Sequence, residues 1–453
     1  MEFTSVNPYN GREVGTYTGL TQEALEEKLR RSQEAFVSWR KVPLAERCRL
    51  IRNAGQVLRD NAGDYARMIT REMGKPLSES RSEVNKCAWV CDFYADNAEA
   101  FLADEIISTD ASQSFVRHDP IGAVLAIMPW NFPFWQVFRY AAPTLTAGNT
   151  GLLKHAPNVF GCAQQIEGIF TKAGYPEGVF QNLIIHHDHT EKIIAHDAVK
   201  AVTLTGSERA GAAVAEIAGK YIKKTVLELG GNNAFIVWSD ADIDKAVKTA
   251  VTARFLNSGQ SCIAAKRFIL LEDIYDEFVS KFTQAVRDRK PGDPMDEATE
   301  IGPLARRDLA DQLHRQVQDS LKQGAELLLG GNQQDCYYEP TILGNVTPGM
   351  PAFDEETFGP MAAVIKARDT DHAFALSEQS KYGLGVTVCT SDIEKALKEI
   401  PKVSDGAYFI NELVKSDPRL PFGGTKNSGY GRELARDGIL EFVNRKTVYV
   451  NKG

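Results

Sequence analysis

Apolar and polar residues alternate with a helical period over most of the first hundred positions. Leu25, Leu29 and Trp39 recur among charged residues at the spacing of one helix face. The same pattern predicts a second long helix over residues 44–73 and a third over residues 79–99. None of these segments carries a cluster of catalytic side chains, so we expect them to form scaffold.

Beyond residue 112 the pattern changes to short apolar strands that alternate with helices. The predicted strands are residues 123–128, 151–154, 182–186, 201–205 and 224–229. Helical periods over residues 163–173 and 209–219 lie between them. This alternation predicts an α/β fold with a doubly wound parallel sheet, which is the usual platform for a dinucleotide.

A second α/β unit follows residue 262. Its predicted elements are strands at residues 268–271 and 327–329 and helices at residues 274–287 and 308–323. The β-branched run at residues 446–450 predicts a terminal edge strand. Because an unpaired edge strand can add to another sheet, this run favours pairing with a second subunit.

Composition narrows the class of protein. The chain has 453 residues, 43% hydrophobic and 25% charged, with a net charge of -8, which is typical of a soluble globular protein and unfavourable for nucleic-acid binding. No apolar run reaches membrane-spanning length, and no signal peptide is visible. The seven cysteines show neither paired spacing nor a metal-ligand pattern. We therefore expect reduced thiols in the cytoplasm, no metal and no membrane partner.

Candidate chemistry begins at Cys262, which small residues flank on both sides. A nucleophilic thiol needs room for a substrate carbon and backbone N–H groups that face the developing oxyanion, and this setting allows both. Glu228 precedes two glycines at the end of a predicted strand, and Asn131 lies between two prolines that restrict its amide. Each motif alone is equally compatible with a structural role: a buried thiol, a capping carboxylate or a turn amide.

Together with the acidic and aromatic loop around Glu356 and Phe358, these stretches resemble the NAD(P)-dependent aldehyde dehydrogenase superfamily over nearly the whole chain. The resemblance implies two doubly wound α/β domains and a small β oligomerisation flap. The implied boundaries are residues 1–111 and 128–230 for dinucleotide binding, 231–430 for catalysis, and 112–127 and 431–453 for oligomerisation. A homodimer or homotetramer is expected.

Roles carried over from the family are expectations for this chain. Cys262 resembles the nucleophile that forms a hemithioacetal and then a thioester, Asn131 the oxyanion donor, and Glu228 the base that activates water. The expected cofactor residues are Trp130, Lys154, Thr205, Gly206, Ser207, Leu229, Glu356 and Phe358. Pro157 stands where the family often has a glutamate that repels a 2′-phosphate, so NADP is predicted to be accepted alongside NAD.

For the aldehyde, Arg139 and Ser416 match the substrate positions of succinate-semialdehyde dehydrogenases, and the loop around Ser416 resembles a short bacterial subgroup. Trp135 is expected to supply an aromatic wall of the substrate tunnel, which is equally compatible with other aldehydes. A further arginine of those enzymes is replaced by Leu256, and whether Lys415 compensates is left open. Ala264 stands where one branch has a second cysteine, so no local redox switch is predicted. The alternatives are a broad-range or aromatic aldehyde dehydrogenase, a cofactor-independent thioesterase or acyltransferase using Cys262, and a non-catalytic homologue.

Overall fold

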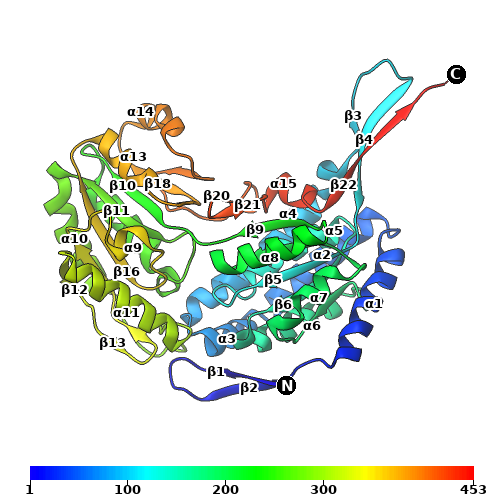
Figure 1. Ribbon diagram of the computed structural model, residues 1–453, viewed down its shortest axis with the longest axis horizontal. Helices are drawn as coiled ribbons and strands as arrows, with labels where there is room; N and C mark the ends of the chain where they lie inside the picture. Colours follow the sequence, from blue (N-terminus) through cyan, green and yellow to red (C-terminus); the bar gives the residue numbers. More distant parts are fainter. Residues whose placement is uncertain (453) are drawn as a thin grey trace.

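The computed structural model describes residues 1–452, and two large sheets form its framework (Figure 1). The first sheet has the strand order β21-β9-β8-β5-β6-β7, and all its neighbours are parallel except β21 and β9. Its strands are β5 (Ala123–Met128), β6 (Thr150–His155), β7 (Phe180–Asn182), β8 (Val199–Thr205), β9 (Lys224–Glu228) and β21 (Gly429–Tyr430).

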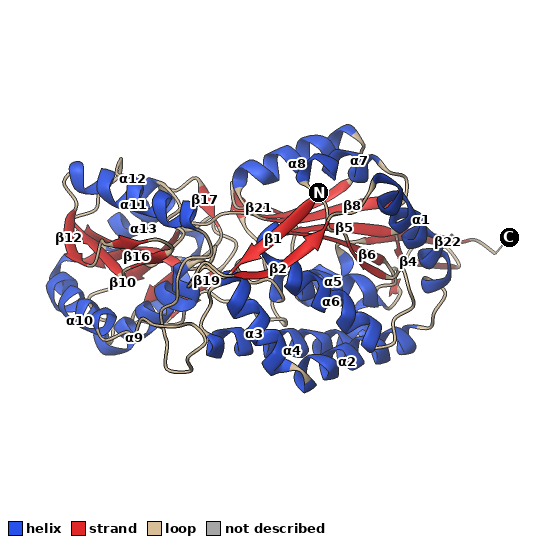
Figure 2. Ribbon diagram, turned by 90° about the horizontal axis from the view of Figure 1, so that it is seen from below, coloured by secondary structure: helices blue, strands red, loops and turns tan. Residues whose placement is uncertain are grey.

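Helices cover both faces of this sheet, with α7 and α8 on one side and α5 and α6 on the other (Figure 2). Alternate residues of β5 face opposite cores: Val124 packs with the α5 side and Leu125 with the α7 and α8 side. The helices of this half are α1 (Gln22–Trp39), α2 (Leu44–Asp60), α3 (Ala62–Met73), α4 (Leu77–Leu102), α5 (Trp135–Thr146), α6 (Phe160–Lys172), α7 (Thr190–Ala195) and α8 (Glu208–Lys220).

Two predicted elements differ from the structure. The helix expected over residues 44–73 is broken at Asn61, whose φ of -120° is not helical and whose side-chain amide donates to the Val57 carbonyl at 2.8 Å. The strand expected over residues 182–186 is β7 (Phe180–Asn182) instead. The apolar residues that follow are buried, but the Ile184 carbonyl accepts from the Leu20 amide rather than from a neighbouring strand of the sheet.

The second sheet has the order β12-β15-β16-β11-β10-β18-β19 and is parallel apart from β12. Its strands are β10 (Asn233–Val237), β11 (Ala265–Leu271), β12 (Glu326–Leu329), β15 (Thr341–Gly344), β16 (Met361–Ala367), β18 (Val386–Cys389) and β19 (Tyr408–Ile410). The helices of this half are α9 (Ile243–Phe255), α10 (Tyr275–Arg287), α11 (Arg307–Lys322), α12 (Pro351–Asp354), α13 (Thr370–Glu378) and α14 (Ile393–Lys398). Two parallel sheets with covering helices confirm the predicted α/β class.

A three-stranded arm projects from the first half of the molecule and ends near the C-terminus (Figure 1). Its strands are β3 (Glu105–Ile106), β4 (Gln113–Pro120) and β22 (Val443–Val450), with β22 at the edge. Helix α15 (Ala435–Leu440) leads into it. Within residues 1–452, no helix is both long and apolar enough to cross a membrane.

Short elements complete the connections. They are β1 (Glu2–Val6), β2 (Glu13–Thr18), β13 (Gln333–Gln334), β14 (Tyr337–Tyr338), β17 (Tyr382–Gly383) and β20 (Thr425–Lys426), together with 3-10 turns that include Pro157–Val159 and Leu256–Gly259. Strand β21 joins the first sheet although its residues fall within the 231–430 range predicted for catalysis. The domain boundaries therefore remain a prediction.

Candidate active site

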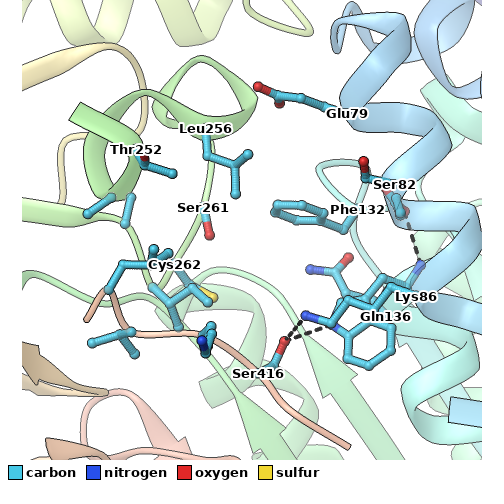
Figure 3. Close-up of a pocket in the computed structure, with 18 of the residues that line it drawn as sticks. Glu79, Ser82, Lys86, Phe132, Gln136, Thr252, Leu256, Ser261, Cys262 and Ser416 are labelled. Atoms are coloured by element: carbon cyan, nitrogen blue, oxygen red, sulfur yellow. Dashed lines mark hydrogen bonds between the residues drawn. The ribbon is translucent and has the colours of Figure 1, made fainter. Parts of the chain in front are cut away.

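Two cavities meet at Cys262, between the two halves of the molecule. The α4 cavity is lined by Lys86, Phe132, Trp135, Leu256 and Ser416, among others (Figure 3). The α8 cavity is lined by Trp130, Thr205, Ser207, Leu229, Glu356 and Phe358, among others. Cys262 and Gln136 line both of them. A group on the sulfur could therefore contact ligands that enter from either side.

The loop before Cys262 has an unusual backbone. Three consecutive residues, Asn257, Ser258 and Gly259, have positive φ values of 54°, 50° and 74°. A Cβ at Gly259 would lie 2.3 Å from the Gly359 carbonyl oxygen, so only glycine fits there. The Asn257 side chain donates to the Asn131 carbonyl at 2.7 Å and thereby ties the cysteine loop to the segment that carries the candidate oxyanion donor.

The Cys262 thiol is half-buried, and burial raises its pKa to about 11, although the Lys266 and Arg139 cations oppose the shift. Lys266 also orders the loop, because its Nζ donates to the carbonyls of Ser261 at 2.9 Å and of Cys262 at 2.8 Å. The thiol is therefore largely protonated at neutral pH in the protein without ligands.

This raised pKa predicts how Cys262 reacts with iodoacetamide. Because only the thiolate reacts, the alkylation rate of the cofactor-free protein should rise about tenfold per pH unit from about pH 7 to about pH 10. Peptide mass spectrometry should follow modification at Cys262, with the half-buried Cys336 as the internal reference thiol. A plateau in the Cys262 rate near the ordinary thiol pKa of about 8.5 would contradict this environment.

The Asn131 amide is held in place by its neighbours. Its Nδ2 donates to the Gln260 carbonyl at 3.0 Å, and its Oδ1 accepts from Gln136 Nε2 at 3.0 Å. With Oδ1 engaged in this way, the second Nδ2 hydrogen remains available. Asn131 is 4% exposed and lines the α8 cavity, in which Cys262 also takes part. The geometry thus allows an N–H donor beside the thiol.

Glu228 lies at the end of β9 and is 2% exposed, and neither of its carboxylate oxygens has a hydrogen-bond partner within residues 1–452. Burial, with the nearby Glu433 carboxylate, raises its pKa well above the ordinary value. Its charge in turn raises the Cys262 pKa slightly. Glu228 does not line either cavity, so its side chain faces the protein interior in this structure.

Most of the predicted cofactor residues gather in the α8 cavity. Thr205, Gly206 and Ser207 connect β8 to the first turn of α8, where Ser207 Oγ accepts from the Ala210 amide at 3.3 Å. The other free amides of this helix end suit a phosphate. Trp130 and Phe358 also line this cavity, and their rings meet edge to face with centroids 5.8 Å apart.

Glu356 and Lys154 differ in their placement. Glu356 lines the α8 cavity, where its Oε1 accepts from the Gly231 amide at 2.9 Å and lies 3.5 Å from Lys266 Nζ. Lys154 lies near the end of β6 beside Ile127, and burial lowers its pKa. Its side chain is not among those that line the α8 cavity.

The three predicted substrate residues all line the α4 cavity. Trp135 and Ser416 are joined by a hydrogen bond from the indole Nε1 to Ser416 Oγ at 3.1 Å. The Arg139 guanidinium already forms an ion pair with Glu433 and donates to Thr205 Oγ1 at 3.2 Å. Its capacity to bind a further anion is therefore reduced.

Leu256 and Lys415 are the two positions for which the sequence leaves the binding of the substrate carboxylate undecided, and both line the α4 cavity. Leu256 is 38% exposed and supplies an apolar wall. The Lys415 ammonium is paired with Glu412 at 2.9 Å and is largely exposed. These contacts leave Lys415 only a weak candidate for a substrate anchor.

Three side chains of the site were missed by the sequence analysis: Gln136, Lys266 and Lys86. Gln136 is the residue that fixes the Asn131 amide, and Lys266 holds the cysteine loop. Lys266 lies only four residues beyond Cys262, so its proximity in sequence was a usable signal. Lys86 lies on α4 and reaches Ser416, which is 330 residues away in the chain, and no local pattern indicates that contact.

Comparison with known proteins covers the whole chain. The model of the aldehyde dehydrogenase family matches residues 1–448. A probable succinate-semialdehyde dehydrogenase [NADP(+)] from Synechocystis sp. is 49% identical over 99% of this chain and 100% of its own. The succinate semialdehyde dehydrogenase [NAD(P)+] Sad of Escherichia coli is 46% identical over 99% and 98%. A solved succinic semialdehyde dehydrogenase from Streptococcus pyogenes, in complex with NADP+, superposes with a TM-score of 0.97 at 38% identity, covering 99% of this chain and 100% of its own.

Proposed function

The chain belongs to the aldehyde dehydrogenase family, and we propose that it oxidises succinate semialdehyde to succinate with NADP or NAD as the hydride acceptor. The observation that carries this proposal is the position of Cys262 at the junction of the α4 and α8 cavities. One cavity can hold the aldehyde and the other the cofactor, with the sulfur between them. The names of the relatives from Synechocystis, Escherichia coli and Streptococcus support the substrate and the cofactor.

In the first half-reaction, the Cys262 thiol gives its proton to solvent water, and the sulfur attacks the aldehyde carbon, which forms the C–S bond of a hemithioacetal as the π bond of the carbonyl breaks. The carbonyl oxygen becomes negative and accepts hydrogen bonds from Asn131 Nδ2 and from the Cys262 amide. Because Gln136 holds Asn131 Oδ1, the amide needs no reorganisation to donate. A hydride then leaves the carbon, so that Cys262 carries a thioester.

In the second half-reaction, Glu228 removes a proton from water, whose oxygen attacks the thioester carbon. The C–S bond breaks, the carboxylate product leaves and the Cys262 thiolate is regenerated. Burial raises the pKa of Glu228, so its carboxylate, once deprotonated, accepts a proton more strongly than an ordinary glutamate does. Since Glu228 does not line either cavity, we infer that its side chain turns toward Cys262 for this step.

The α8 cavity fits a nicotinamide dinucleotide. The start of α8 at Ser207 offers backbone N–H groups for a pyrophosphate, and the Glu356 carboxylate can accept from ribose hydroxyls. Trp130 and Phe358 supply flat apolar walls for the rings. When bound, the cofactor supplies the hydride acceptor; its binding and orientation are the task of these residues.

Cofactor choice should depend on the absence of a carboxylate at Pro157. Pro157→Glu is expected to raise KM for NADP about 5- to 10-fold, because an exposed charge near a 2′-phosphate repels it by about 1 kcal/mol. KM for NAD should stay constant or fall. Steady-state kinetics with both cofactors measure the change, and Pro157→Gln controls for the loss of proline. An equal response of the two cofactors to Pro157→Glu would refute this assignment.

Two other functions remain to be separated from this one. A broad-range or aromatic aldehyde dehydrogenase is favoured by the aromatic wall of Phe132 and Trp135 in the α4 cavity. A cofactor-independent thioesterase or acyltransferase would use Cys262 without the α8 cavity. Incubation with a panel of aldehydes and each cofactor, with no phosphate or coenzyme A, decides among them through the absorbance of the reduced nicotinamide. No reduced cofactor with any aldehyde would reject the proposed activity.

We propose further that the protein is a cytoplasmic homo-oligomer, a dimer or a tetramer. The projecting arm supports this assembly, since β22 presents its free edge at the border of the three-stranded sheet. Its outward-facing side chains are largely exposed in the single chain. A strand of another copy could add to that edge.

A further inference from the structure

Four cationic side chains line the α4 cavity: Lys75, Lys86, Arg139 and Lys415. Three of them already face a carboxylate, and the pairs are Lys75–Glu83, Arg139–Glu433 and Lys415–Glu412. Within residues 1–452, no carboxylate oxygen lies within ion-pair distance of Lys86 Nζ. Lys86 is therefore the cation of this cavity whose charge is not matched by the protein itself.

Lys86 is held in a defined position without an anion. Its Nζ donates to Ser416 Oγ at 2.9 Å and lies 4.3 Å from the centre of the Trp135 ring. Because Ser416 Oγ also accepts from Trp135 Nε1 at 3.1 Å, the serine hydroxyl proton is free to donate elsewhere. Two ammonium hydrogens and one hydroxyl hydrogen thus remain unused at one end of the cavity, which matches the needs of a carboxylate.

The position of this pair relative to Cys262 suits a short chain. Figure 3 shows Lys86 and Cys262 on opposite sides of the α4 cavity, with Ser416 at its lower border. The lining of the cavity also includes the apolar side chains of Phe132, Leu256 and Phe422. A ligand with an aldehyde at one end, a few methylene groups and an anionic group at the other end would match these three regions.

We propose that Lys86, together with the Ser416 hydroxyl, binds the carboxylate of the substrate and determines the preference for ω-carboxy aldehydes. This inference rests on the proposed function and assigns its anion site to α4 rather than to Arg139. Arg139 keeps its ion pair with Glu433 in the lining of the cavity. The substrate carboxylate then supplies the negative charge that balances the Lys86 ammonium, which the protein itself does not provide.

The charge of Lys86 is sensitive to pH. Burial, and secondly the nearby Arg139 charge, lower its pKa to about 8, while Cys87, Asp417 and Glu83 act in the opposite direction. Of these carboxylates, Glu83 is paired with Lys75 and Asp417 with Arg419. Lys86 is charged below its pKa and neutral above it. Since that pKa is lowered to about 8, the anion site should weaken as the pH rises through about 8.

The test compares Lys86→Met with the wild type on succinate semialdehyde and on butanal, a neutral aldehyde of equal chain length. The variant should raise KM for succinate semialdehyde about 10- to 100-fold, while kcat/KM for butanal changes by less than about threefold. An equal loss for both aldehydes, or no loss for either, would overturn the role of Lys86. Circular dichroism and the melting temperature establish that the variant is folded.

Lys415→Met separates the two lysines of the cavity. It should change KM for succinate semialdehyde far less than Lys86→Met does, because Glu412 already balances its charge. In the wild type, KM for succinate semialdehyde should rise above about pH 8, whereas KM for butanal should not follow. A larger effect from Lys415→Met, or the same pH profile for both aldehydes, would contradict the proposal.

A binding measurement keeps this inference separate from the proposed function. Succinate should slow the alkylation of wild-type Cys262 by iodoacetamide, and Lys86→Met should abolish that protection. If the wild type prefers succinate semialdehyde to butanal but Lys86→Met keeps both the preference and the protection, the assignment of the anion site to Lys86 is wrong, whereas the proposed function stands. If the wild type shows neither the preference nor the protection, both fail.

Discussion

Replacing Cys262 by alanine is expected to lower kcat/KM for aldehyde oxidation by at least about ten-thousand-fold, with or without saturating cofactor. The Cys262 side chain lines both the α4 and the α8 cavity, and among residues 1–452 no other cysteine lines either of them. Without it, neither the C–S bond of the hemithioacetal nor the thioester can form. Reduced-cofactor absorbance over long incubations measures the residual rate.

Two companion variants make the Cys262 result specific. Cys336→Ala removes a half-buried thiol outside both cavities and should leave the rate within about twofold of wild type. Cys262→Ser keeps the side-chain size but offers a poorer nucleophile and leaving group, so it should also be nearly inactive. An active Cys262→Ala protein, with a rate near that of the wild type, would reject covalent catalysis by this residue.

The second large effect is expected at Glu228. Glu228→Gln should lower the steady-state kcat about 10²- to 10⁴-fold, because the amide cannot take a proton from the hydrolytic water. The first turnover should survive, since thioester formation does not use this carboxylate. Rapid mixing should therefore show a burst of reduced cofactor of about one equivalent per site, followed by a slow phase.

Stability distinguishes a chemical role from a structural one. The Glu228 oxygens are buried and have no hydrogen-bond partner among residues 1–452, so removal of the ionisable group should not lower the melting temperature. The melting temperature of Glu228→Gln should equal or exceed that of the wild type, because a charged carboxylate is costly to bury. Loss of the burst in proportion to the steady-state rate would place Glu228 in the first half-reaction instead.

Much of the framework was predictable because strands buried on both faces leave a continuous apolar signal. The predicted range 123–128 coincides with β5, whose residues pack against helices on both sides. The break at Asn61 was not predictable from apolar spacing, since the helical pattern continues through α2 and α3. The error at residues 182–186 has a similar origin, because burial alone made an apolar segment resemble a strand.

The candidate site was less predictable from the sequence than the framework. Cys262, Asn131 and Glu228 were predicted from local motifs that resemble those of the family, and their roles remain predictions. Lys86 has no local motif around it, because its hydrogen-bond partner Ser416 lies 330 residues away in the chain. Gln136 is 3% exposed and bonds Asn131, five residues earlier, but nothing in the spacing indicates that this amide faces the candidate oxyanion donor. The ion pair of Arg139 with Glu433 was equally invisible, because the two residues are distant in the chain.

One sulfur carries the acyl group between oxidation and hydrolysis in the proposed mechanism, and the acyl group can be trapped on it. Glu228→Gln protein is mixed with succinate semialdehyde and NADP, quenched in acid during the burst and digested for peptide mass spectrometry. We expect the peptide containing Cys262 to carry a succinyl group in an amount nearly equal to that of the reduced cofactor formed. Reduced cofactor without any acyl group on Cys262, or an acyl group on another residue, would contradict it.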